Sequence, residues 1–454
     1  MKNREYFGNR FGVLVALAGS AIGLGNMWRF PYLVGQNGGA AFIIIYLLLL
    51  FFICLPVMIS EFLIGRRTHA NAFRAFRQLN GKKTGWDVIG IFAVLAAVCI
   101  LSFYCVVGGW TVKYFIQSCA MTFNTPGMDY SSYFSGFISA PFQPLFFTFI
   151  FLGMTGGIIA VGVKNGIEKF SKVMMTVLFV LVVLIAIRSL TLPGASDGIR
   201  YLLIPDFSKV NGHTIVAALG QAFFSISIGC GTILTYGSYV KDSENIALTS
   251  AYTALMDTLF AMIAGIAIIP AVYAIAYMNG YAPEINAGPG LVFITLPGVF
   301  KAMPMGNLIS IIFFLSLMLA ALTSSISQME SFVAYLIEEV GISRKKAALT
   351  SFGISIVLGT FCSLSQGVLS DVHLFGKNIF DFFDAVSSNV LMTFGGLLMV
   401  IYAGWRMKKS DYLDELSNHG NTTMPRWLLE LICFLVKYVA PLGIIAIIAS
   451  NLFS

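Results

Sequence analysis

Residues 20–32 read SAIGLGNMWRFPY and interrupt the first long apolar run of the chain. Gly23 and Gly25 weaken a helix, Asn26 is a polar amide, and Arg29 brings a charge one turn later. A helix crossing lipid normally carries Leu, Ile and similar side chains at such positions. The stretch therefore predicts a break in a membrane-spanning helix, where the freed backbone needs a partner other than lipid.

The composition supports a membrane protein, because 57% of the 454 residues are hydrophobic and only 11% are charged. A crossing of the bilayer needs roughly 20 apolar residues. About eleven runs meet that need: 8–34, 39–65, 88–120, 145–163, 167–188, 214–240, 245–279, 306–338, 346–364, 378–405 and 427–450. The predicted fold class is an all-α membrane protein with about eleven transmembrane helices.

The basic residues concentrate in alternate connections, which predicts the orientation. They include Arg66, Arg67, Arg74, Arg77, Lys82, Lys83, Lys164, Lys241, Arg344, Lys345, Lys346, Arg406, Lys408 and Lys409. The connection 121–144 has no Lys or Arg. We therefore expect a plasma (inner) membrane protein with a cytoplasmic N-terminus, an uncleaved first helix and an external C-terminus. The positive residues that give the net charge of +7 lie in alternate connections, as membrane orientation requires, so no nucleic-acid partner is expected.

A second disturbed stretch, FFSISIGCGT at 223–232, lies in the sixth apolar run. An odd number of spans per unit inverts the next unit, so breaks in runs one and six predict an inverted repeat with a midplane binding site. The expected organisation is one transmembrane domain with repeats 8–188 and 214–405 and an additional helix in 406–454. The alternative for a single glycine pair is close helix packing.

Unwound helices in lipid free backbone carbonyls and amides, each of which costs several kcal/mol without a partner. Carbonyls and hydroxyls suit a hard monovalent cation, and a half-helix N-terminus suits a carboxylate. Ala320, Thr323 and Ser324 share one face of the eighth run and suit such a cation, although small polar residues also occur as packing motifs. Asp257, inside an apolar run, should face a partner, whether functional or structural.

Five separated motifs resemble the neurotransmitter:sodium symporter family, in particular its bacterial amino-acid transporters with eleven transmembrane helices. They are SAIGLGNMWRFPY (20–32), NGGAAF (37–42), EFLIGR (61–66), GQAFFSISIGCG (220–231) and LTSSIS (322–327). The resemblance implies a leucine-transporter-like fold with broken first and sixth helices. It also implies import of an amino acid together with sodium.

The resemblance assigns residues to two sodium sites and one substrate site. The metal set is Gly19, Ile22, Ala320, Thr323 and Ser324 for one ion, and Ala21, Asn26, Ser225 and Asp257, with the substrate carboxylate, for the other. The substrate set is Ser20, Ala21, Leu24, Gly25, Ile100, Tyr104, Phe224, Ser225, Ser227, Cys230, Ser324 and Gln328. Asp257 stands where many members have asparagine, so we expect chloride independence; proton uptake by Asp257 is left open.

The resemblance also assigns gates. Arg29 and Asp384, helped by Gln221, correspond to the outer gate, and Asp381 is an alternative partner for Arg29. The inner gate corresponds to Arg4 and Glu338, with Tyr239 nearby. Family members often have a large aromatic residue at the position of Cys230, and its absence here leaves room in the pocket. The expected substrate is therefore a large neutral amino acid, hydrophobic or aromatic.

Other classes fit less well. A substrate-gated channel would also tolerate polar residues along a pore, and an amino-acid receptor would bind without transport. The four histidines, His69, His213, His373 and His419, have no metal or triad spacing, so no enzyme is expected. The expected partners are an amino acid, two sodium ions in the family's pattern, and membrane lipid.

Overall fold

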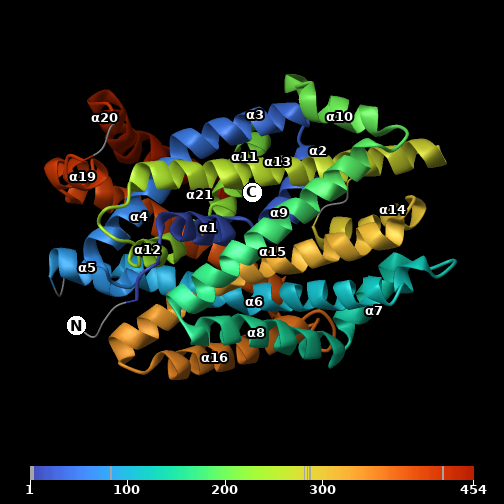
Figure 1. The fold of residues 1–454 in the computed structure, drawn as a ribbon, viewed down its shortest axis with the longest axis horizontal. Helices are drawn as coiled ribbons and strands as arrows, with labels where there is room; N and C mark the ends of the chain where they lie inside the picture. Colours follow the sequence, from blue (N-terminus) through green and yellow to red (C-terminus); the bar gives the residue numbers. More distant parts are fainter. Residues whose placement is uncertain are drawn as a thin grey trace.

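The structure, a computed structural model, describes residues 5–81, 84–280, 282, 283, 285, 288–421 and 424–453, with side chains up to residue 450. Long helices lie side by side along one direction (Figure 1). α5, α19 and α20 lie at one end of this bundle, and α7, α10 and α14 lie at the other. This arrangement is the one expected of a multi-pass membrane protein.

The apolar runs of the sequence form the long elements of the bundle, which we number as spans in chain order. Span one is α1 (Arg10–Ala21), η1 (Gly25–Arg29) and α2 (Phe30–Gln36); span two is α3 (Ala40–Leu49), η2 (Leu50–Cys54) and α4 (Leu55–Thr68); span three is α6 (Val88–Cys119); span four is α8 (Gln143–Val161); span five is η4 (Val163–Glu168) and α9 (Lys169–Leu190); span six is α11 (Gly212–Ser225) and α12 (Thr232–Gly237). Span seven is α13 (Ile246–Asn279); span eight is α15 (Gly306–Tyr335) and η7 (Leu336–Val340); span nine is α16 (Arg344–Leu364); span ten is α17 (Ile379–Ala385), η8 (Val386–Leu391), α18 (Met392–Ile401) and η9 (Tyr402–Arg406); span eleven is α20 (Arg426–Phe434), η10 (Leu435–Val439) and α21 (Ala440–Phe453).

Shorter elements connect the spans. They are α5 (Ala72–Asn80), η3 (Thr122–Asn124), α7 (Tyr130–Ser139), α10 (Ala195–Leu203), η5 (Phe207–Lys209), η6 (Leu291–Thr295), α14 (Leu296–Ala302) and α19 (Lys409–Leu416). Strands β1 (His373–Leu374) and β2 (Lys377–Asn378) form a small antiparallel hairpin between spans nine and ten.

The predicted spans are confirmed with small shifts at their ends. In the described parts of the chain, nine helices are long and apolar enough to cross a membrane, and the bent pair Arg10–Ala21 and Gly25–Gln36 gives a tenth. The run predicted at 214–240 forms α11 and α12, which are too short individually because the helix breaks between them. Both predicted breaks are therefore present.

Spans seven and eight occupy the centre of the bundle. Their apolar windows are 72% and 78% buried by protein, whereas those of spans four, five and nine are 33–39% buried. The outer spans therefore present most of their apolar surface to lipid. This places the small polar residues of span eight inside the protein, next to span one.

The break in span one follows from its glycines. α1 ends at Ala21, the backbone of the next residue, Ile22, is extended (φ −72°, ψ 110°), and the helix axis resumes bent by 52°. A Cβ at Gly23 would lie 2.4 Å from the Ser324 hydroxyl oxygen, so no larger residue fits between spans one and eight. The break in span six depends on Gly229 (φ +83°), where a Cβ would lie 2.2 Å from the Met392 carbonyl oxygen.

Candidate substrate and sodium site

Asp257 of span seven is completely buried beside both breaks. Its carboxylate accepts hydrogen bonds from Asn26 Nδ2 (2.7 Å) and from Ser225 Oγ (2.9 and 3.1 Å to the two oxygens). Tyr46 OH lies 3.5 Å from Oδ2. Within the described chain, no Lys, Arg or His nitrogen lies within 4.0 Å of this carboxylate. The structure thus gathers Asn26, Ser225 and Asp257, which the resemblance assigned to one sodium site, and leaves the negative charge without a cationic side chain.

The five residues of the other predicted sodium site also converge. Thr323 Oγ1 donates to Ala320 O (3.0 Å) and lies 3.5 Å from Ile22 O, and Ser324 Oγ donates to Ile22 O (3.3 Å). A Cβ built on Gly19 would lie 3.5 Å from Thr323 Cβ. Carbonyl and hydroxyl oxygens from spans one and eight therefore meet at one place, and such neutral oxygens suit a small hard cation.

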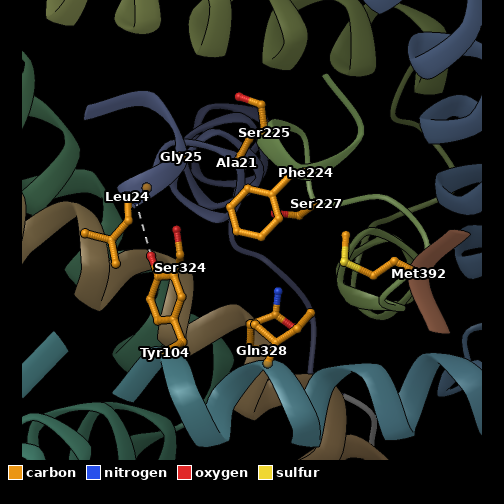
Figure 2. Close-up of a pocket in the computed structure, with 12 residues that line it drawn as sticks. Ala21, Leu24, Gly25, Tyr104, Phe224, Ser225, Ser227, Ser324, Gln328 and Met392 are labelled. Atoms are coloured by element: carbon orange, nitrogen blue, oxygen red, sulfur yellow. Dashed lines mark hydrogen bonds between the residues drawn. The ribbon is translucent and has the colours of Figure 1, made fainter. Parts of the chain in front are cut away.

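A cavity lies between these two clusters, and Figure 2 shows the side chains that surround it. Ten of its lining residues belong to the predicted substrate set: Ala21, Leu24, Gly25, Ile100, Tyr104, Phe224, Ser225, Ser227, Ser324 and Gln328. The Tyr104 hydroxyl accepts a hydrogen bond from the Leu24 N–H (3.4 Å) at the break. The cavity therefore has main-chain polar groups on one side and mixed side chains on the other.

Two predicted substrate residues, Ser20 and Cys230, lie behind the cavity wall. The Ser20 carbonyl accepts from Ser227 Oγ (3.0 Å), and its hydroxyl donates to Ser327 Oγ (2.8 Å). Cys230 Sγ accepts from Gln328 Nε2 (3.6 Å). Both residues thus support side chains that line the cavity.

Two lining residues, Gly23 and Met392, were missed by the sequence interpretation. Gly23 lies inside the stretch that predicted the break, so its place could have been found. Met392 comes from span ten, and nothing in the surrounding apolar run distinguishes it.

Glu61 of span two supports the second break. Its buried carboxylate accepts a hydrogen bond from the Gly229 N–H (2.6 Å), a backbone group freed by the interruption of span six. This contact meets the requirement that unwound backbone in a membrane protein finds an internal partner. The motif EFLIGR contains Glu61, but its contact depends on how spans two and six pack.

A wide vestibule, with a volume of about 610 Å³, leads to the cavity from the end that contains α7, whose Phe134 and Ile138 contribute to its lining. Leu24, Gly25, Tyr104 and Phe224 line both spaces, so the predicted substrate residues Tyr104 and Phe224 lie between them.

The predicted outer-gate residues line this vestibule. Arg29, Asp381 and Asp384 all face it, but among described residues Arg29 makes no ion pair within 4.0 Å. The Arg29 guanidinium instead lies 5.2 Å from the centre of the Phe224 ring. Gln221 Nε2 donates to Gly25 O (3.1 Å), which connects the two broken spans. The predicted pairing of Arg29 with Asp384 remains a prediction for a closed vestibule.

The opposite end of the bundle is closed by buried polar contacts. Tyr239 OH donates to Glu330 Oε1 (2.6 Å), and Arg344 donates to Glu330 Oε2 (2.7 Å). The Phe7 N–H donates to Tyr239 O (3.0 Å), and the Phe7 ring packs against Tyr236 and Tyr239. The N-terminal segment is thereby held against the end of span six, which Glu330 connects to spans eight and nine.

Of the predicted inner-gate pair, the structure describes Glu338 but not Arg4. The Glu338 carboxylate accepts from the backbone N–H and the side-chain amide of Asn71 (2.9 and 2.8 Å). Arg4 lies outside the described residues, so its pairing with Glu338 stays a prediction. Glu330 was not predicted, although a carboxylic acid inside the apolar eighth run was a visible signal.

The chain matches known proteins over nearly its whole length. The family model described as "Sodium:neurotransmitter symporter family" matches residues 4–131 and 144–454. An uncharacterized sodium-dependent transporter, YhdH of Bacillus subtilis, is 39% identical over 97% of this chain and 96% of its own length. An uncharacterized sodium-dependent transporter of Haemophilus influenzae is 35% identical over 100% of this chain and 99% of its own length.

Among solved structures, the crystal structure of MhsT in complex with L-phenylalanine is similar with a TM-score of 0.89. The two chains are 40% identical, and the match covers 99% of this chain and 100% of MhsT. The fold, the two breaks and these matches lead to one conclusion. The chain belongs to the sodium:neurotransmitter symporter family and is a sodium-dependent multi-pass membrane symporter, not an enzyme.

Proposed function

We propose that this symporter imports a large neutral amino acid, hydrophobic or aromatic, together with two sodium ions and without chloride. Transport proceeds by alternating access, with the vestibule open to the exterior in the conformation described here. The observation that carries the proposal is the buried Asp257 carboxylate, which lies between the two breaks and has no cationic side chain beside it.

The Asp257 environment favours a bound cation. Removing a carboxylate from water costs several kcal/mol, and three neutral donors offset only part of that cost. A sodium ion beside Asp257, Ser225, Asn26 and the Ala21 carbonyl supplies the missing positive charge. Because this fixed carboxylate already balances the cation, chloride is not needed. The carboxylate of the amino acid then binds the same ion, which couples sodium to substrate.

The second cation is proposed between spans one and eight. Its ligands are Gly19, Ile22, Ala320, Thr323 and Ser324, all neutral oxygen donors. Entry of one charge down a membrane potential of 100 mV releases about 2.3 kcal/mol. Two ions therefore contribute about 4.6 kcal/mol, enough to concentrate a neutral substrate by roughly three orders of magnitude.

The substrate class follows from the cavity wall. Ile100, Phe224 and Met392 give it apolar surface, which suits a large hydrophobic side chain. Gln328 adds a polar group: its Nε2 donates to Cys230, while its Oε1 has no hydrogen-bond partner in the described structure. A side chain that carries an N–H or O–H satisfies this oxygen, so tyrosine is favoured over phenylalanine. The L-phenylalanine bound to MhsT supports an aromatic amino acid.

The proposed orientation places the N-terminus, α5 and α19 in the cytoplasm and the C-terminus outside. The basic connections 66–83, 344–346 and 406–409 lie at the cytoplasmic end in this orientation, as the positive-inside rule requires.

A thermal-stability screen of the twenty amino acids, in sodium and in potassium, tests substrate and cation together. We expect one group of large neutral amino acids to stabilise the purified protein in sodium only. A Gln328→Leu variant should lose the preference for tyrosine and keep phenylalanine. Equal stabilisation in both salts would contradict sodium coupling.

Uptake into proteoliposomes separates the alternatives of transport, conduction and binding. A symporter concentrates labelled amino acid when sodium is higher outside, and collapse of the sodium gradient releases the label. A channel would pass sodium current that does not saturate with substrate, and a receptor would accumulate no label.

A further inference from the structure

A second cavity, separate from the substrate cavity, lies where the end of span ten meets span eleven. It has a volume of about 310 Å³ between η9 and η10, and we call it the η9/η10 cavity. Its lining includes Gly404, Lys409, Glu430, Phe434, Lys437 and Tyr438. The neighbouring helices α19 and α20 lie at the same end of the bundle as α5 (Figure 1). Neither transport nor sodium binding, as proposed above, uses this cavity.

Lys437 is a cationic residue of the cavity lining, although it belongs to an apolar span. Its Nζ lies 4.6 Å from the centre of the Trp405 ring and 5.4 Å from that of Tyr438. In the part of the chain that the structure describes, no carboxylate oxygen lies within 4.0 Å of this ammonium group. Aromatic faces stabilise a cation but do not neutralise it. The charge is therefore available to an anion.

The position of Lys437 is fixed by close contact between the two spans. A Cβ at Gly404 would lie 2.8 Å from the Lys437 Cα, so the glycine lets the backbones of η9 and η10 touch. The Trp405 indole N–H donates to the Lys437 carbonyl (3.0 Å). These contacts place a lysine side chain and two aromatic rings in one fixed arrangement.

The cavity lining also contains a second lysine and an acid. Lys409 Nζ lies 3.8 Å from Glu430, and Arg426 Nε also lies 3.2 Å from this carboxylate. Glu430 therefore shares its one negative charge between two cations. Together with Lys437, the cluster has three positive charges and one negative charge, a surplus that attracts an anion.

The surroundings of the cavity face lipid. Trp405 is 59% exposed, Phe434 53% and Tyr438 44%. Tryptophan and tyrosine rings with these exposures, next to lysines, are typical of the boundary between headgroups and acyl chains. An anion that reaches this site from the membrane would bring an apolar tail along Phe434.

We propose that the η9/η10 cavity binds the phosphate of an anionic phospholipid from the cytoplasmic leaflet. Lys437 and Lys409 contact the phosphate, Trp405 and Tyr438 lie beside the glycerol region, and the acyl chains follow the exposed face of span eleven. Basic pockets between transmembrane helices on the cytoplasmic side recognise anionic headgroups by the same charge complementarity. The choice of leaflet rests on the orientation proposed above; the binding itself does not depend on transport.

Native mass spectrometry of the purified full-length protein tests this site. Phosphatidylglycerol and phosphatidylcholine with the same acyl chains are added in separate titrations. Wild-type protein should retain phosphatidylglycerol more strongly. The Lys437→Gln/Lys409→Gln variant should weaken that binding by about fivefold per lysine removed, whereas phosphatidylcholine binding should not change. The matched control is Lys345→Gln, which removes an exposed lysine at the same end of the bundle.

Two further variants protect the test against a folding defect. Lys437→Arg keeps the charge and should keep phosphatidylglycerol binding. Lys409→Gln alters only a side chain that is 64% exposed, and should weaken binding about fivefold without changing the melting temperature. Millimolar inorganic phosphate should not displace the lipid. Equal binding of the two lipids, equal binding by the double variant and the Lys345→Gln control, or displacement by free phosphate would each overturn the proposal.

Discussion

Replacing Asp257 with asparagine removes one negative charge and almost no volume. The carboxylate is completely buried and accepts bonds from Asn26 and from Ser225, with Tyr46 OH 3.5 Å away. An asparagine side chain in the same position keeps one acceptor oxygen. Its amide N–H groups can donate to the Ser225 or Tyr46 hydroxyl oxygen. The fold of the sodium-free protein should therefore survive, with a melting temperature equal to or above that of the wild type.

Sodium binding should respond much more strongly. Removing one partner of a buried charge pair costs about 3–5 kcal/mol, because the other charge is left without compensation. Applied to sodium beside Asp257, this loss weakens sodium binding by about two to three and a half orders of magnitude. Chloride added near the site can restore part of the missing charge, so chloride should recover a part of sodium binding and of uptake in Asp257→Asn.

The assay is thermal stability titrated with sodium chloride, sodium gluconate and potassium chloride, followed by uptake into proteoliposomes in the same salts. The control is Asp371→Asn, which makes the same chemical change in an exposed loop and should behave as the wild type in all three salts. An Asp257→Asn protein with wild-type sodium response would refute the proposed role of the carboxylate. A variant that loses the sodium response but is indifferent to chloride would refute the charge-balance argument alone.

Three further substitutions test other contacts. Gly23→Ala places a Cβ 2.4 Å from a span-eight hydroxyl and should weaken substrate binding at least tenfold in a scintillation-proximity assay, whereas Gly220→Ala, with open space around its Cβ, should not. Thr323→Val removes a hydroxyl that contacts the Ala320 carbonyl and should raise the sodium concentration for half-maximal stabilisation about tenfold, with unchanged melting in potassium. Glu330→Gln breaks a buried ion pair and should lower the free energy of unfolding by about 3 kcal/mol, measured by chemical denaturation; no change would show that the pair is not needed to close this end.

The sequence predicted the spans and both breaks because these features are local. An apolar run of sufficient length has one favourable environment, and glycines with polar neighbours mark the point where a helix ends inside it. Most site residues of spans one, six and eight also lie in the motifs that carry the family resemblance, and Asp257 of span seven is marked by its charge inside an apolar run. Their convergence around Asp257 and Thr323 agrees with the predicted sets.

Other parts of the site depend on how distant spans pack, and no local pattern reports them. Met392 lines the cavity because span ten passes Gly229, whose missing side chain allows the contact. Glu61 meets the freed N–H of the same glycine from span two. Whether Arg29 pairs with Asp384 depends on whether the vestibule is open or closed. The sequence does not specify which of these conformations a structure shows.

Because the inner end is closed, release of the substrate also requires water to enter the protein at that end. One buried carboxylate, Glu330, is shared by Tyr239 and Arg344, so these contacts must separate together when this end opens. In the proposed cycle, water that enters then hydrates the bound sodium and returns several kcal/mol of solvation for each ion. Release of the substrate thus takes up water. Osmolytes that are excluded from the protein surface oppose hydration of newly exposed surface, so they should slow turnover without changing the affinity for substrate on the vestibule side.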